Sequence, residues 1–165
     1  MQQKKQAVIL RHAQATSPAS APTDEERPLT EAGKRQALLL GQQWAKMSWF
    51  PDLVIVSPAK RTLETLAAVE EGLGRNDLNR NVYPNFYLGG HHEMMVAMAQ
   101  MKQDYERLLL IGHNPGWSDA IAYLTEQYLS METGQAIEIL PLDCQLDWMT
   151  ILASPGSCKI GQSWR

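Results

Sequence analysis

The sequence predicts an α/β fold, in which helices cover both faces of a central sheet. Short, purely apolar runs that are typical of buried strands recur along the 165-residue chain. Between them lie segments with the apolar periodicity of helices, and such alternation favours a sheet covered on both faces. The length suits one core, and no linker or internal repeat divides the chain, so we expect a single domain over residues 1–165.

The first third of the chain predicts a strand, a loop and a helix. Ala7–Leu10 is a short apolar run and is expected to form a buried strand. Residues 14–28 are rich in alanine, serine, threonine and proline, which is typical of an exposed loop. Thr30 can cap a helix whose apolar residues recur at helical spacing from Ala37 to Ala45.

The middle of the chain predicts a similar series. Residues 52–56 predict a second strand. Ser57-Pro58 then predicts the start of a helix, with serine as the cap and proline at the first helical position, and this helix continues to about Gly72. Residues 74–81 are polar and are expected to form a loop. We expect a short strand over residues 82–87, although a proline within it weakens the pattern.

The last part of the chain begins with an expected helix over residues 93–104. Its methionines at 94, 98 and 101 share one face, a stripe that is more typical of a core than of a cofactor site. A third buried strand, a further helix and two later strands are expected over residues 107–112, 117–128, 137–140 and 148–152. The tail after Ser154 shows no clear pattern.

Composition excludes several classes of protein. The chain is 44% hydrophobic and 20% charged, which is ordinary for a globular domain. A net charge of −3 argues against nucleic acid as the main partner. Cys144 and Cys158 form no CxxC pair, so they indicate neither a disulfide framework nor a zinc site. No apolar run is long enough for a secretory signal or a membrane span, and we therefore expect a cytoplasmic protein without a membrane partner.

Polar residues follow three of the predicted strands. In chain order they are Arg11 and His12, Ser57 and Arg61, and His113 and Asn114. Ligands of open α/β sheets bind beyond the carboxyl ends of the strands, and the helix expected to begin at Ser57 would add free N–H groups and a positive dipole end. Each residue alone has an ordinary interpretation, such as a surface arginine or a histidine bonded to backbone. Three strands that all deliver arginine or imidazole groups are hard to explain by packing, and they predict an anion pocket.

Four motifs carry a resemblance to a known family. They are R-H-A after the first strand, R-P-L-T at 27–30 with Gly33, V-S-P-x-x-R at 56–61 and G-H-N-P at 112–115. In this order the chain resembles the histidine phosphatase superfamily. The short length, and alanine in place of the more usual glycine at position 13, make it most similar to the SixA-type phosphohistidine phosphatases. The resemblance runs from residue 7 to about 125, and a T-G-x-A-I segment at 133–137 extends it weakly.

The resemblance implies a fold and a set of roles. The fold is a three-layer α/β/α sandwich with a mostly parallel sheet, similar to that of phosphoglycerate mutases. His12 would be the nucleophile, and Arg11, Arg61 and His113 would hold the phosphoryl group. Arg27, Ser57 and Asn114 are the further candidates for substrate binding. No metal and no cofactor is expected.

These residue types suit phosphoryl transfer, which depends on positioning and on stabilising charge. A planar guanidinium can bind two phosphoryl oxygens at once. A histidine nucleophile must be neutral, and adjacent arginines disfavour its protonation. The same cations can therefore bind the phosphate and keep His12 reactive.

The leaving group separates the possible substrates. An alkoxide needs a general acid, whereas the imidazole of phosphohistidine is a weaker base and needs less help. Glu93, in the segment GGHHEMM, is the candidate acid, with His91 or His92 behind it. We favour the alternative that all three are solvated residues in a first helical turn. Adjacent histidines diverge on a helix and no HExxH is present, so a metal site there is weaker still.

A weak acid candidate favours a phosphohistidine substrate on a partner protein. The resemblance implies that this partner is a phosphotransfer domain of a signalling or sugar-transport relay. Two alternatives remain: a small-molecule phosphomonoesterase of the same superfamily, and a non-catalytic module that binds phosphorylated partners.

Overall fold

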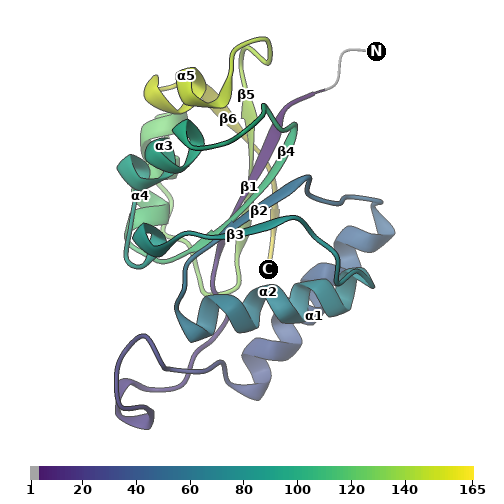
Figure 1. The fold of residues 1–165 in the computed structure, drawn as a ribbon, viewed down its shortest axis with the longest axis vertical. Helices are drawn as coiled ribbons and strands as arrows, with labels where there is room; N and C mark the ends of the chain where they lie inside the picture. Colours follow the sequence, from purple (N-terminus) through teal and green to yellow (C-terminus); the bar gives the residue numbers. More distant parts are fainter. Residues whose placement is uncertain (1–3) are drawn as a thin grey trace.

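The computed structural model describes residues 4–165, which contain a six-stranded sheet between two helical layers (Figure 1). The strands are β1 (Gln6–Arg11), β2 (Leu53–Val56), β3 (Arg80–Val82), β4 (Arg107–Gly112), β5 (Ala136–Pro141) and β6 (Cys158–Trp164). The order across the sheet is β3-β2-β4-β1-β5-β6. The pairs β3–β2, β2–β4 and β4–β1 are parallel, whereas the pairs β1–β5 and β5–β6 are antiparallel. This is the expected mostly parallel α/β sheet.

The helices divide between the two faces of the sheet. They are α1 (Glu31–Lys46), α2 (Lys60–Leu73), α3 (His91–Ala99), α4 (Gly116–Thr125) and α5 (Trp148–Ala153), with short 3₁₀ turns at Pro18–Ser20 and Pro84–Phe86. One face packs against α1 and α2, and the other packs against α3, α4 and α5 (Figure 1). The expectation of a three-layer sandwich is confirmed.

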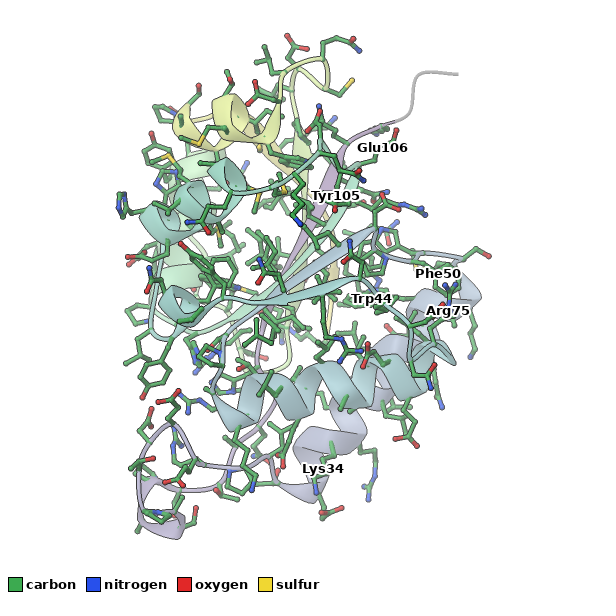
Figure 2. All side chains as sticks on the ribbon, in the orientation of Figure 1. Lys34, Trp44, Phe50, Arg75, Tyr105 and Glu106 are labelled. Carbon is green, nitrogen blue, oxygen red and sulfur yellow. The ribbon has the colours of Figure 1, made fainter. Side chains whose placement is uncertain are left out.

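Strand β1 shows how the period-two pattern of a strand serves both layers. Val8 and Leu10 belong to the core under α1 and α2, whereas Ala7 and Ile9 belong to the opposite core. All four are at most 3% exposed, which explains the unbroken apolar run. Figure 2 shows side chains filling the space between the sheet and both helical layers.

The predicted cap of α1 is confirmed. The hydroxyl of Thr30 accepts the N–H of Gly33 at 3.0 Å, and α1 begins at the next residue, Glu31. A Cβ at Gly33 would collide with the carbonyl oxygen of Gln14, so glycine lets the helix approach the loop closely. The strands predicted at 7–10, 52–56 and 107–112 are also confirmed to within one residue at each end.

The prediction that Ser57 and Pro58 start the second helix was wrong. Helix α2 begins at Lys60, and the N–H of Lys60 donates to the carbonyl of Glu25 in the 14–28 loop at 2.9 Å. A carbonyl from a distant loop thus caps this helix, and its first N–H is not free for an anion. Ser57 instead lies against His113, as described below.

The prediction of a strand over 148–152 was also wrong, because this segment forms α5. Trp148, Ile151 and Leu152 are buried at helical spacing, and the carboxylate of Asp147 caps the N–H of Thr150 at 2.8 Å. The patternless tail forms β6, which pairs with β5 at the edge of the sheet. An edge strand with exposed side chains leaves little apolar signal.

Three other boundaries differ from the prediction. The strand expected over 82–87 lies earlier, at β3, so residues 80 and 81 of the expected 74–81 loop are strand, and a 3₁₀ turn begins at Pro84. Helix α3 begins at His91 and ends at Ala99, short of Asp104. Helix α4 ends at Thr125, because Glu126 adopts the left-handed conformation. Among the described helices none is long and apolar enough to cross a membrane.

Candidate active site

The carboxyl ends of β2, β4 and β1 lie side by side, since these strands are neighbours in the sheet. The N–H of His12 donates to the carbonyl of Gly112 at 3.0 Å, and the N–H of Ser57 donates to the carbonyl of Ile111 at 3.1 Å. The rings of His12 and His113 have their centroids 5.4 Å apart. The fold therefore brings the ends of three separate strands to one place.

The ring of His12 is held in a single tautomer. Its Nδ1 lies 2.7 Å from the carbonyl oxygen of Ala13, and because a carbonyl only accepts, Nδ1 carries the hydrogen. In the neutral ring, Nε2 then keeps its lone pair, and it has no hydrogen-bond partner among residues 4–165. The residue is only 7% exposed. His12 thus presents an oriented, unoccupied nitrogen lone pair.

The pKa of His12 favours the neutral ring. Burial, reinforced by the nearby arginines led by Arg61, lowers this pKa from its ordinary 6.5 to about 4. The hydrogen bond to Ala13 opposes the shift. The expectation named the arginines as the cause, and they do contribute, but burial is the larger effect.

His113 is also neutral and fully engaged in the free protein. Its Nδ1 lies 3.3 Å from Nη2 of Arg61, and because a guanidinium only donates, Nδ1 must accept. The hydrogen is therefore on Nε2, which donates to the hydroxyl of Ser57 at 2.7 Å. Burial, reinforced by the charge of Arg61, lowers the pKa of His113 to about 3.

Ser57 has a hydrogen left to offer. Its oxygen accepts from His113 and, at 3.3 Å, from the N–H of Ala59, so the hydroxyl hydrogen can donate to a ligand. Ser57 thus connects the end of β2 to the ring that follows β4.

Two guanidinium groups, the partly buried Arg11 and the buried Arg61, bring positive charge to the site. Nη1 of Arg11 donates to the carbonyl of Met131 at 2.7 Å, and Nη1 of Arg61 donates to the carbonyl of Asp24 at 2.7 Å. The Nε atoms of both arginines are buried with no hydrogen-bond partner among the described residues. Unpaired buried donors are costly and rare, and an oxyanion is the ligand that would satisfy them.

A second group of contacts holds His12 in place. The N–H of Gly134, a residue with φ of 72°, donates to the carbonyl of His12 at 2.8 Å. The hydroxyl of Thr65 accepts the N–H of Ala13 at 3.0 Å and donates to the carbonyl of Arg61 at 2.7 Å. Thr65 thereby links the segment after β1 to helix α2.

Arg27 lies at the edge of the site, on the loop before α1. Its Nε donates to Asp24 at 2.9 Å, and its Nη1 donates to the carbonyl of Thr16 at 2.8 Å. Its charge contributes to lowering the pKa of His12. Arg27 therefore lies near the histidine site, and its contact with substrate stays a prediction.

The side chain of Asn114 is used within the protein. Its Nδ2 donates to the carbonyl of Met131 at 3.0 Å, and its Oδ1 accepts from the hydroxyl of Ser118 at 2.9 Å. These bonds link the start of α4 to Met131, whose carbonyl also accepts from Arg11. A direct role of Asn114 in substrate binding stays a prediction.

Glu93 caps α3. Its carboxylate accepts the N–H of Gly90 at 2.7 Å, and this bond lowers the pKa of Glu93, which keeps the group ionised. His91 donates to the carbonyl of Leu152 and stacks on Tyr123 with ring centroids 3.8 Å apart. Glu93 and His91 are thus bonded within the fold rather than solvated as expected, and their contacts favour a structural role over a general acid.

Sequence reasoning missed two side chains near the site, Asp24 and Tyr87. The carboxylate of Asp24 lies 3.0 Å from Nη2 of Arg61 and accepts from the hydroxyl of Tyr87 at 2.6 Å. The ring of Tyr87 also meets the ring of His113 edge-on, with centroids 5.6 Å apart. The position of Asp24, three residues before Arg27, was the only available signal.

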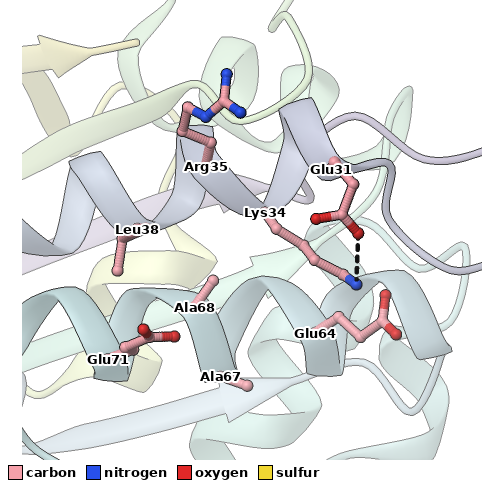
Figure 3. Close-up of a pocket in the computed structure, with 8 residues that line it drawn as sticks. All are labelled: Glu31, Lys34, Arg35, Leu38, Glu64, Ala67, Ala68 and Glu71. Carbon is pink, nitrogen blue, oxygen red and sulfur yellow. Dashed lines mark hydrogen bonds and ion pairs between the residues drawn. The ribbon is translucent and has the colours of Figure 1, made fainter.

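The surface has a groove elsewhere, between α1 and α2, of about 390 Å³ (Figure 3). It is lined by Glu31, Lys34, Arg35, Leu38, Glu64, Ala67, Ala68 and Glu71. None of these is a strand-end residue, so the groove is separate from the histidine site. In residues 4–165, no group of three or more histidine, cysteine or acidic side chains is placed to hold a metal ion.

Comparison with known proteins extends these observations. The model of the histidine phosphatase superfamily (branch 1) matches residues 7–86. An uncharacterized chloroplastic protein of Arabidopsis thaliana is 26% identical over 161 residues, which cover 93% of this chain and 74% of the relative.

Solved structures share the whole fold. A protein of Nakamurella multipartitia, provisionally named phosphohistidine phosphatase SixA, matches with a TM-score of 0.81 at 23% identity, over 98% of this chain and 95% of that one. The protein histidine phosphatase SixA in complex with tungstate matches with a TM-score of 0.78 at 23% identity, over 96% and 95% of the two chains. The matched segment of the family model includes the R-H-A motif and Arg61. Over residues 7–86, just under half of the chain, the sequence is similar to the histidine phosphatase superfamily, and the chain shares the fold of the two SixA structures.

Proposed function

We propose that the protein is a phosphatase that hydrolyses phosphohistidine on a partner protein, through a phosphohistidine intermediate on His12. The observation that carries the proposal is the free Nε2 lone pair of a neutral His12, close to the guanidinium groups of Arg11 and Arg61, whose buried Nε–H groups have no acceptor within residues 4–165. A phosphoryl group is a ligand that supplies both an electrophilic phosphorus and the missing acceptor oxygens.

In the first step, Nε2 of His12 attacks phosphorus in line with the leaving nitrogen. The new N–P bond forms as the N–P bond of the substrate breaks, and the leaving imidazole keeps the electron pair and takes up a proton from solvent. Arg11 and Arg61 bind the equatorial oxygens as their charge develops. The hydroxyl hydrogen of Ser57 can donate to the same oxygens, with His113 behind it.

In the second step, water attacks the phosphorus of the His12 intermediate. A P–O bond forms, the N–P bond breaks, and phosphate leaves with one proton of the water passing to solvent. The bond from Nδ1 to Ala13 keeps the ring oriented through both steps. His12 returns to its neutral form.

The ionised state of two carboxylates, Glu93 and Asp24, favours a substrate with an imidazole leaving group over one with an alkoxide leaving group. Glu93 is held ionised by its bond to Gly90, and the hydroxyl of Tyr87 helps to lower the pKa of Asp24 to about 2. Neither group holds a proton that it could give to an alkoxide near neutral pH. The neighbours named SixA are called phosphohistidine phosphatases, which supports the same substrate class.

The substrate class is tested by measuring turnover of a phosphohistidine-bearing phosphotransfer protein and of a panel of sugar phosphates under the same conditions. We expect kcat/KM to be higher for the phosphoprotein. Acid-labile phosphate should be trapped on wild-type protein and be absent from His12→Ala.

Other outcomes favour the alternatives. Faster turnover of sugar phosphates would identify a small-molecule phosphomonoesterase. Tight binding of the phosphoprotein without turnover or trapped label would identify a non-catalytic binding module.

A further inference from the structure

The returning arm of the 14–28 loop is bound to the first turn of α2. The carbonyl of Glu25 accepts the N–H of Lys60 at 2.9 Å, and the carbonyl of Asp24 accepts Nη1 of Arg61 at 2.7 Å. The arm thus satisfies a donor at the start of the helix. It also holds the exposed residue Asp24 beside a guanidinium that is itself only 2% exposed.

The carboxylate of Asp24 accepts hydrogen bonds from three segments of the chain. Oδ2 accepts from Nη2 of Arg61 at 3.0 Å and from the hydroxyl of Tyr87 at 2.6 Å. Oδ1 accepts from Nε of Arg27 at 2.9 Å. The hydroxyl of Tyr87, followed by Arg61, lowers the pKa of Asp24 to about 2, so the carboxylate stays charged at neutral pH.

These contacts fix the orientation of Arg61. Asp24 binds both terminal nitrogens, through its carbonyl and its carboxylate, while Nη2 also reaches Nδ1 of His113 at 3.3 Å. The Nε–H of Arg61 remains buried without an acceptor in the described part of the chain. One end of the guanidinium is therefore taken by the protein, and a donor is left for a ligand.

We propose that Asp24 is a positioning residue, which holds the guanidinium groups of Arg61 and Arg27 in the orientation that binds the phosphoryl group. The inference rests on the proposed function, because that function assigns the phosphoryl contact to Arg61. Arginine has many rotamers, and a buried guanidinium without its carboxylate turns toward other acceptors. The loop carboxylate removes that freedom before substrate arrives.

A different role for Asp24 would have the opposite effect. An internal carboxylate that occupied the phosphoryl position would compete with substrate, and its removal would strengthen anion binding. The unpartnered Nε atoms of Arg11 and Arg61 argue against this role, because the carboxylate does not satisfy them. The sign of the change in affinity therefore distinguishes positioning from competition.

The test compares Asp24→Asn with Glu26→Gln, which removes one negative charge from the same arm. The carboxylate of Glu26 accepts from the hydroxyl of Thr23, within the loop. The dissociation constant for tungstate is measured by calorimetry, and kcat and KM are measured on the phosphoprotein. For Asp24→Asn we expect the tungstate dissociation constant and KM to rise roughly 10- to 100-fold, with a smaller change in kcat. Glu26→Gln should change both by less than about twofold.

Two further variants keep the test decisive. Asp24→Glu keeps the charge and should recover part of the affinity. Tyr87→Phe removes a single hydroxyl from the network and should also weaken tungstate binding, by a smaller factor than Asp24→Asn. This variant provides the test if Asp24→Asn folds poorly.

Several results would overturn the proposal. Unchanged tungstate binding in a folded Asp24→Asn would make Asp24 a loop tether only, and tighter binding would make it a competing anion. If the wild type binds tungstate but hydrolyses no phosphorylated compound, the proposed function fails, while tungstate affinity still decides the role of Asp24.

Discussion

Arg107 at the amino edge of the sheet and Arg61 at the carboxyl edge lie near opposite ends of β4. Nη2 of Arg107 donates to Asp52 at 2.8 Å, and its N–H donates to the other carboxylate oxygen at 2.9 Å. At the same edge, Lys5 pairs with Asp104 at 2.5 Å and donates to the carbonyl of Leu146 at 2.6 Å. Each of these cations has a carboxylate of its own.

The carboxyl edge has fewer negative charges than positive ones. Arg61 and Arg27 share the carboxylate of Asp24, and Arg11 makes no ion pair within residues 4–165. Buried positive charge without a partner opposes folding, whereas a neutralised pair can serve as a structural link. The difference teaches that the cations of one edge stabilise the fold, while those of the other are available for an anionic ligand.

Loss of one imidazole from the carboxyl edge should have the largest effect. For His12→Ala we expect turnover to fall at least about a thousandfold, because the nucleophile is gone, while tungstate binding persists through the arginines. Single-turnover rates on the phosphoprotein measure this, with exposed His92→Ala as the control. A rate within tenfold of the wild type would contradict the assignment.

Removing one arginine from each edge in turn should show directly that only the carboxyl edge binds substrate. Arg61→Ala removes charged hydrogen bonds worth about 1.5–3 kcal/mol, so the KM for phosphorylated substrate should rise roughly 10- to 100-fold. Arg107→Ala at the other edge should leave KM unchanged. Steady-state kinetics of both variants test the contrast, and equal losses of affinity would remove it.

The buried imidazole should make stability depend on pH. The pKa of His12 is lowered to about 4 in the folded protein from an ordinary 6.5, so between these values the unfolded chain binds more protons. The free energy of unfolding should therefore fall as pH falls, by about 2 kcal/mol from this residue between pH 7 and pH 5. Urea unfolding of the wild type and of His12→Asn at both pH values measures the difference. An equal pH dependence in both proteins would show that His12 is not the source.

The smallest effect should come from removing the Arg107–Asp52 ion pair at the amino edge. Arg107 and Asp52 are 37% and 31% exposed in their side chains, so their ion pair is partly screened by water. Arg107→Ala should lower the free energy of unfolding by about 1 kcal/mol without affecting turnover. Urea titration together with a phosphatase assay checks this. A loss of turnover at full stability would mean that this edge also serves the reaction.

Much of the frame could be predicted from local patterns. The buried strands at 7–10, 52–56 and 107–112 are apolar throughout, because helices cover both faces of each. Arg11, His12 and His113 follow such strands directly. The rule that ligands bind beyond the carboxyl ends of parallel strands was then enough to expect these residues in one place.

The errors arose where short segments fit two structures. Residues 148–152 contain bulky apolar side chains that suit a strand as well as a helix, and the cap at Asp147 together with packing on α3 decides for the helix. Ser57-Pro58 has the local chemistry of a helix start, yet the hydroxyl binds His113 and the loop carbonyl of Glu25 caps α2 instead. In both cases a partner distant in the sequence settles the outcome.

Residue identity and order were enough to predict the central parallel strands β1, β2 and β4, the motifs of the resemblance and the imidazole proposed as nucleophile. The tautomer of His12, the depth of its burial and the selection of Asp24 from three consecutive acidic residues required the folded chain. The physical reason is range: apolar periodicity and capping act over a few neighbours in the sequence. Desolvation and charge pairing depend on every group within several ångströms in space, including those contributed by distant segments.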